Sequence, residues 1–189
     1  VFTAFVGRLG TAAMAAQQAC LAIESLGFIA SYALGNASGT IVAQKLGANE
    51  PNEAEQTIWF TMRFSLLLMC GVGALFFLGA ETFVGWFCTD PESLALGILC
   101  MKIASLAQPL MAFCDCFAGS LRGAGDTKSP MIAAIFGPVA VRITACYLLA
   151  FTFELGLVGI WIGSTLDWGI RALWLFFVVK KGHWKEIVI

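Results

Sequence analysis

Charged residues are scarce in this sequence. Lys, Arg, Asp and Glu make up 12% of its 189 residues, and the formal net charge is −1. An average soluble domain has about 25% charged and about 45–50% apolar residues, whereas 59% of this chain is apolar. Without an excess of positive charge, the sequence offers no basic surface for nucleic acid. The composition favours a membrane protein, in which the 20 glycines are also usual.

Side chains for catalysis or metal binding are also few. His183 is the single histidine, and it lies beside Lys181 and Trp184 near the end of the chain. The pair Cys114 and Cys116 is spaced too closely for a usual zinc site, and the seven cysteines are interpreted as small apolar fillers. No nucleophile–base spacing, phosphate loop or metal cluster occurs. The sequence therefore predicts neither an enzyme nor a bound cofactor.

Long hydrophobic runs dominate what is present. Their lengths suit helices that cross a bilayer core of about 30 Å. We predict an all-α, polytopic transmembrane helix bundle that forms one domain over residues 1–189. Residues 1–8 are too short to span and resemble the end of a helix that began earlier, so we expect a piece of a longer protein. The five predicted spans are about 11–46, 57–80, 92–121, 130–152 and 155–179.

Two acidic residues, Glu24 and Asp115, lie inside these spans. A charge near the bilayer centre costs about 2.5–3.5 kcal/mol on insertion scales, so such residues usually face a protein interior or a wet cavity. We predict a functional role for both. The alternative is that each carboxyl group only forms a hydrogen bond with a neighbouring helix.

Polar residues recur every seven positions on two spans, and this spacing drifts by only about 20° per step on a helix. Each polar stripe predicts a cavity-facing side, although interhelical hydrogen bonding is preferred for the hydroxyls and Gln17. Three glycines and one serine, spaced four apart, predict close helix packing beside the first stripe. The first stripe is Gln17, Glu24, Ser31, Ser38 and Lys45; the second is Gln108, Asp115 and Arg122; the small residues are Gly27, Ser31, Gly35 and Gly39.

The remaining charges within the spans suggest ion pairs. Asp167 and Arg171 are four residues apart in the favourable order, so we predict a structural ion pair between them. Arg142 lies mid-span and needs a partner, for which Asp115 and Glu24 are the candidates.

Positive charges are distributed unevenly among the connecting segments. The segments after the first, third and fifth spans hold six cations, and those after the second and fourth hold none; Arg8 alone opposes this bias. Cytoplasmic loops are enriched in Lys and Arg, so the C-terminus is predicted to be cytoplasmic. The six cations are Lys45, Arg122, Lys128, Lys180, Lys181 and Lys185.

Five sequence motifs, taken together in this order, resemble the multidrug and toxic compound extrusion (MATE) transporters. The motifs are LGTAAMAAQQ (9–18), SGTIVAQKLGAN (38–49), WFCTDPE (86–92), LRGAGDTKSP (121–130) and GLVGIWIGSTLDWGIR (156–171). The resemblance implies a twelve-helix protein of two six-helix lobes in the cell membrane. This chain would cover the end of helix seven and helices eight to twelve, without the N-terminal lobe.

The resemblance also implies export of organic, often cationic, compounds in exchange for protons or sodium ions. Many members carry an acid on helix ten where this chain has Met111, and Asp115 lies one turn further along on a similar face. We hypothesise that Asp115 and Glu24 exchange the coupling ion for substrate, because a desolvated carboxyl group holds a proton more readily. The candidate cavity-lining residues are Gln17, Ser31, Gln108, Met111 and Arg142.

Three other functions remain open at this stage. A flippase for lipid-linked oligosaccharides would favour long cationic stripes in the cavity. A non-transporting membrane scaffold would pair its intramembrane charges with each other. A truncated, inactive product would expose an apolar flank where the missing lobe docks.

Overall fold

The computed structural model describes residues 6–7 and 9–186, and within these residues it contains helices and no strand. The predicted helix end at residues 1–8, with Arg8, lies almost wholly outside the described part. Five helical segments are long and apolar enough to cross a membrane, which confirms the predicted fold class. They are α2 (Thr11–Gly47), α3 (Pro51–Leu78), α5 (Pro91–Gly123), the segment Lys128–Thr152 and α8 (Gly156–Lys181).

The start of α3 differs from the predicted start of the second span. The sequence predicts a span from about residue 57, but the helix begins at Pro51. A proline suits the first helical position, and Glu53 in the first turn interacts favourably with the positive end of the helix dipole. After the short helix α4 (Ala80–Gly85), Asp90 caps α5 by accepting a 3.0 Å hydrogen bond from Ser93 N.

The fourth spanning segment is irregular. It consists of α6 (Lys128–Phe136), the π-helical turn η1 (Gly137–Arg142), α7 (Ile143–Tyr147) and a second π-helical turn, η2 (Leu148–Thr152). Pro138 lies in η1 and has no N–H to donate to the preceding turn. Such π-helical turns frequently occur at functional sites, and η1 carries Arg142.

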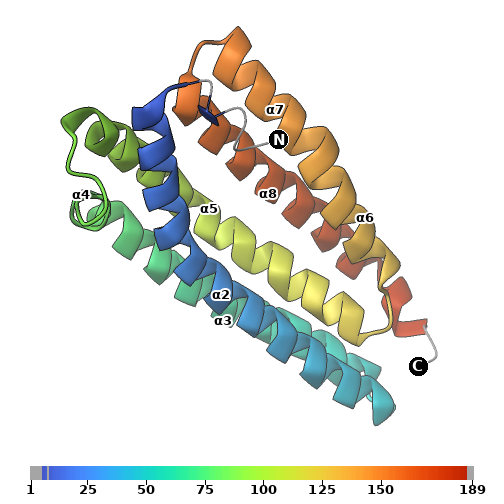
Figure 1. Ribbon diagram of the computed structural model, residues 1–189. Helices are drawn as coiled ribbons and strands as arrows, with labels where there is room; N and C mark the ends of the chain where they lie inside the picture. The colour runs from blue at the N-terminus through green and yellow to red at the C-terminus, as the bar shows by residue number, and fades with distance from the viewer. Residues whose placement is uncertain (1–5, 8, 187–189) are drawn as a thin grey trace.

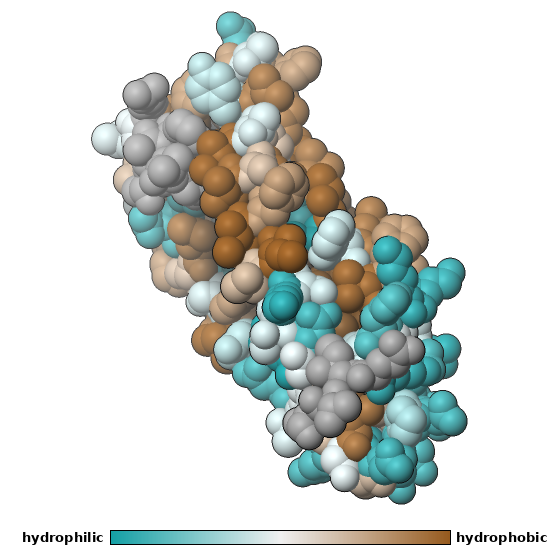
Figure 2. Space-filling view, turned by 90° about the vertical axis from the view of Figure 1, so that its right-hand side faces the viewer, coloured by the Kyte–Doolittle hydropathy of each residue, from teal (hydrophilic) through white to brown (hydrophobic). Residues whose placement is uncertain are grey.

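The helices form two groups (Figure 1). Helices α2, α3 and α5 pack together, and α8 lies between α5 and the segment α6–η2. The connections after α2 and α5 and the end of α8 lie at the same end of the bundle, so the six predicted loop cations gather there. On the face formed by α6–α8, a broad hydrophobic band covers the middle, and hydrophilic residues collect toward the lower end (Figure 2).

Helices α2 and α5 approach each other closely through glycine. A Cβ built on Gly119 would lie 1.9 Å from Gly35 O, and one built on Gly123 would lie 2.0 Å from Gly39 O. No side chain fits there without moving a backbone. The small-residue ridge predicted on the first span is therefore the surface that packs on α5, as small residues allow in membranes. We call this contact the glycine seam, made of Gly35, Gly39, Gly119 and Gly123.

Candidate functional site

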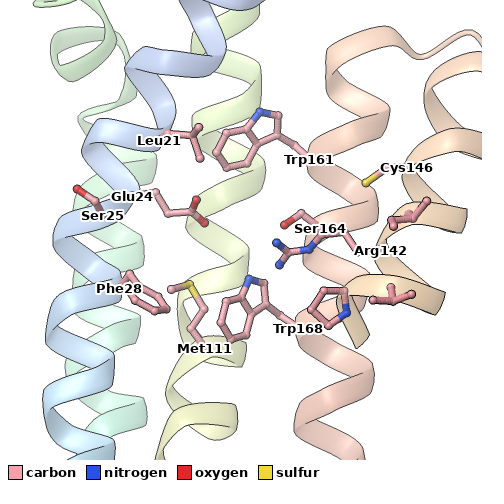
Figure 3. A pocket seen from close by; sticks show the side chains of 13 residues that line it. Leu21, Glu24, Ser25, Phe28, Met111, Arg142, Cys146, Trp161, Ser164 and Trp168 are labelled. Carbon is pink, nitrogen blue, oxygen red and sulfur yellow. The ribbon is translucent and has the colours of Figure 1, made fainter. Parts of the chain in front are cut away.

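A pocket of about 620 Å³ opens on the side of α2 that faces α8 (Figure 3). Ligand pockets usually measure about 300–1,000 Å³, so this one has room for a drug-sized molecule. It lies between α2, α5, η1, α7 and α8. Its lining is mainly apolar and aromatic, and consists of Leu21, Glu24, Ser25, Phe28, Met111, Pro138, Val139, Arg142, Ile143, Cys146, Trp161, Ser164 and Trp168.

Helix α2 supplies one wall and its carboxylate. Leu21, Glu24, Ser25 and Phe28 follow the spacing that places residues on one face of a helix. The Glu24 side chain is half-buried and points toward the opposite wall (Figure 3). Within the described residues it has no ion-pair partner within 4.0 Å and no hydrogen bond, so its charge is available to a ligand.

Helix α8 supplies the opposite wall through Trp161, Ser164 and Trp168, which share one face of that helix. Trp161 is almost fully buried, and its Nε1 donates a 2.9 Å hydrogen bond to Gln17 Oε1. This bond fixes the indole ring at one end of the pocket. Two tryptophan rings on one wall can bind flat apolar groups or organic cations.

Arg142 brings a positive charge to the pocket from η1. Its Nε lies 3.0 Å from Asp167 Oδ2. Arg171 Nη2 lies 2.8 Å from the same oxygen, so Asp167 and Arg171 form the i,i+4 ion pair predicted from the sequence. Asp167 is fully buried, whereas the Arg142 side chain keeps 26% of its surface exposed. Two guanidinium groups thus share one carboxylate, and Arg142 faces the pocket (Figure 3). The partner of Arg142 is Asp167 and not Asp115 or Glu24, because α8 packs directly on η1.

Three of the predicted cavity-lining residues lie elsewhere. Gln17 is bonded to Trp161, Ser31 Oγ donates a 2.6 Å hydrogen bond to Asp115 Oδ2, and Gln108 is buried against Gly27. All three are enclosed by neighbouring helices, so they pack between helices and do not line the pocket. Met111 and Arg142 do line it.

Asp115 and Glu24 therefore occupy separate environments. Asp115 is half-buried beside the glycine seam, where its backbone carbonyl would be 2.4 Å from a Cβ on Gly35. It has no ion pair within 4.0 Å among the described residues, and its hydrogen-bond partner is Ser31. The two acids do not meet in one site.

Sequence reasoning missed the tryptophan wall. The candidate residues predicted from the sequence do not include Trp161, Ser164 or Trp168. The available signal was the spacing of 161, 164 and 168, which places the three on one helical face. The sequence does not say which neighbour that face meets.

Comparison with known proteins shows the family of this chain. The family MatE matches residues 1–148, which is most of the chain. The chain belongs to this family. Members of this family are multi-pass membrane transporters and not enzymes, and the five helical segments of spanning length agree with that architecture.

Individual relatives share both sequence and fold with this chain. A probable multidrug resistance protein NorM of Brucella suis is 32% identical over 173 residues, which cover 89% of this chain and 37% of that protein. The eukaryotic MATE transporter AtDTX14 has a TM-score of 0.85 at 26% identity, covering 92% of this chain and 39% of that one. An outward-facing multidrug resistance MATE transporter of the MOP superfamily has a TM-score of 0.89 at 21% identity, and the match covers 100% of this chain and 42% of that one. The chain thus spans well under half the length of these proteins.

Proposed function

We propose that this chain is the second lobe, without most of its first helix, of a secondary active transporter that exports organic compounds. The compounds are often cationic, and the driving force is an inward flow of protons or sodium ions. The proposal includes an N-terminal lobe, which would supply the other side of a central cavity. The MATE and NorM relatives support a drug efflux protein of this kind.

One observation supports this proposal above the others. The pocket combines an unpaired carboxylate, Glu24, with two tryptophans and room for a drug-sized molecule. An ionised carboxylate in low-dielectric surroundings attracts a cation, and aromatic faces add cation–π attraction. A proton or a sodium ion and a cationic substrate can therefore compete for Glu24, and competition for one site makes exchange possible.

Asp115 would act as a second coupling acid, away from the substrate. Its carboxylate and the Ser31 hydroxyl, 2.6 Å apart, offer oxygen ligands to a small ion beside the glycine seam. Oxygen ligands suit hard cations such as sodium, and a carboxyl group also accepts a proton. In this proposal Glu24 binds the substrate, and Asp115 binds the coupling ion.

The alternative functions are less well supported. The residues that line the pocket include one cation, Arg142, and not the row of cations expected of a lipid-linked oligosaccharide flippase. A scaffold would pair its charges, but Arg142 and Arg171 both pair with Asp167, so Glu24 and Asp115 have no cation within 4.0 Å in the described segments. We also propose that the protein resides in the cell membrane with its C-terminus in the cytoplasm, as the cation-rich end of the bundle suggests.

The test is efflux by the full-length protein that carries this chain. A proton or sodium gradient would be imposed across inside-out membrane vesicles that contain the protein. Uptake of a fluorescent organic cation into these vesicles would then be measured. Glu24→Gln and Asp115→Asn should each reduce gradient-driven uptake to the level of empty vesicles. Glu81→Gln is the matched control, because Glu81 is exposed on α4 and is not among the residues that line the pocket.

The amount of protein in the membrane must be equal for all variants. Under that condition, gradient-driven transport that persists in both acid variants would contradict the proposed roles. A protein that carries no organic cation under either gradient would contradict the exporter itself.

A further inference from the structure

Arg142 and Glu24 face each other across the same pocket, from η1 and α2 (Figure 3). We propose that Arg142 is a specificity-determining residue that binds an acidic group of the substrate, so that the pocket prefers flat aromatic compounds carrying both a cationic and an anionic group. This inference rests on the proposed function, in which the pocket is the substrate site.

The charge balance of the cluster supports an anion site. Asp167 carries one negative charge and is approached by two guanidinium groups, so the three residues together keep one positive charge. Within the described residues no second carboxylate lies within 4.0 Å of either arginine. Glu24 faces this charge across the pocket but lies beyond 4.0 Å, so an anionic ligand group in direct contact with Arg142 would be stabilised there.

The geometry leaves Arg142 free for this task. Arg171 forms a hydrogen bond with Asp167 and keeps only 12% of its side chain exposed, whereas Arg142 keeps 26% exposed and its guanidinium group points into the pocket beside Ser164. Arg142 approaches Asp167 through Nε. Its terminal nitrogens form no ion pair or hydrogen bond with a described residue, and a guanidinium group presents several donors in a planar fork that matches a carboxylate.

Aromatic rings lie between the two charges. Trp168 contacts the cluster, with Arg171 Cζ 4.0 Å and Arg142 Cζ 5.9 Å from its ring centroid. The same pocket is also lined by Trp161, Phe28 and Met111. A flat ring system can therefore lie between Glu24 and Arg142, with its cationic end toward the first and its acidic end toward the second.

Two dyes that differ by one ester test this directly. Rhodamine 110 carries a free carboxylate, and rhodamine 123 is its methyl ester, a plain cation with the same ring system. Fluorescence anisotropy with the purified full-length protein gives both dissociation constants. The wild-type protein should bind rhodamine 110 more tightly, and Arg142→Gln should weaken rhodamine 110 at least about tenfold, the size expected for a hydrogen bond between charged groups.

Three further variants make the result specific. Arg142→Gln should weaken rhodamine 110 much more than rhodamine 123, and Arg142→Lys should keep part of the preference for the acid. Glu24→Gln should weaken both dyes, since both keep the cationic ring. Arg63→Gln is the matched control, because Arg63 is exposed on α3 outside the pocket. Equal elution on size-exclusion chromatography checks that the variants are folded.

An unchanged ratio of the two dissociation constants in Arg142→Gln would overturn the inference, as would a wild-type preference for the ester. Failure of the exporter proposal would look different. In that case neither dye would bind, or both would bind without any gradient-driven movement across vesicles.

Discussion

The two halves of α2 differ in almost every respect. The second half meets α5 at the glycine seam, where backbones touch and the polar groups are mainly hydroxyls: Ser38 Oγ lies 2.8 Å from Thr61 Oγ1 and 2.7 Å from Ser120 Oγ. The first half borders the pocket, with Glu24 unpaired and tryptophans opposite. A single helix thus combines a rigid contact and an open site.

This difference assigns separate tasks to the two helix groups. The seam leaves no space for sliding, so α2, α3 and α5 should move as one unit. Across the pocket, η1 and α8 are joined by the ion cluster, and α8 also approaches the backbone of η2 and α7 closely at Gly159 and Gly163, so these segments should move as a second unit. Predictions that perturb the seam and spare the pocket, or the reverse, test this division.

The largest effect is expected from Asp167→Asn. It would leave the partly buried guanidinium groups of Arg142 and Arg171 without their counter-charge, and breaking such a pair typically costs about 3–5 kcal/mol. Asp115, beside the glycine seam, provides the comparison. Asp115→Asn should lower the free energy of unfolding much less, because an amide oxygen can still accept the hydrogen bond from Ser31. Thermal unfolding in detergent, followed by tryptophan fluorescence, measures both. Equal losses would show that the two acids are held in the same way.

A smaller loss should follow Gly119→Ala. The new methyl group would lie 1.9 Å from Gly35 O, and overpacking of this kind costs about 1–3 kcal/mol. Gly71→Ala is the control, because a Cβ on Gly71 meets nothing within 4 Å, and alanine favours a helix by about 1 kcal/mol over glycine. If Gly119→Ala and Gly71→Ala unfold at the same temperature, the seam is not the tight contact proposed here.

The smallest effect concerns neither the seam nor the pocket. Lys185 forms an ion pair with Glu55 between the C-terminal segment and α3, with both side chains about one-third exposed or more. Solvent-exposed pairs contribute at most about 1 kcal/mol, and salt screens them. Glu55→Gln should therefore lower the unfolding temperature only slightly, and less at high salt. A loss as large as that of Gly119→Ala would mean that this end of the bundle carries more of the stability than the seam.

Long apolar runs were enough to predict five spanning helices, since length and hydropathy do not depend on neighbours. The site was harder to predict. One polar stripe on α2 suggested one cavity, but successive residues meet different partners: Gln17 meets Trp161, Glu24 meets the pocket and Ser31 meets Asp115. A stripe defines a direction on a helix, whereas the partner at each level depends on how the other helices cross it. For the same reason Arg142 could not be matched with Asp167 from sequence.

The most direct test of the central claim is substrate protection of a thiol placed in the pocket. Ser164→Cys in the full-length protein puts a reactive group on the α8 wall, opposite Glu24. Labelling by a small methanethiosulfonate reagent would be timed with and without rhodamine 123, and Cys70, an exposed native cysteine on α3, serves as the internal reference. We predict that the dye slows labelling at position 164 and leaves Cys70 unchanged. If a bound dye does not change the rate at position 164, the pocket between α2 and α8 is not the substrate site.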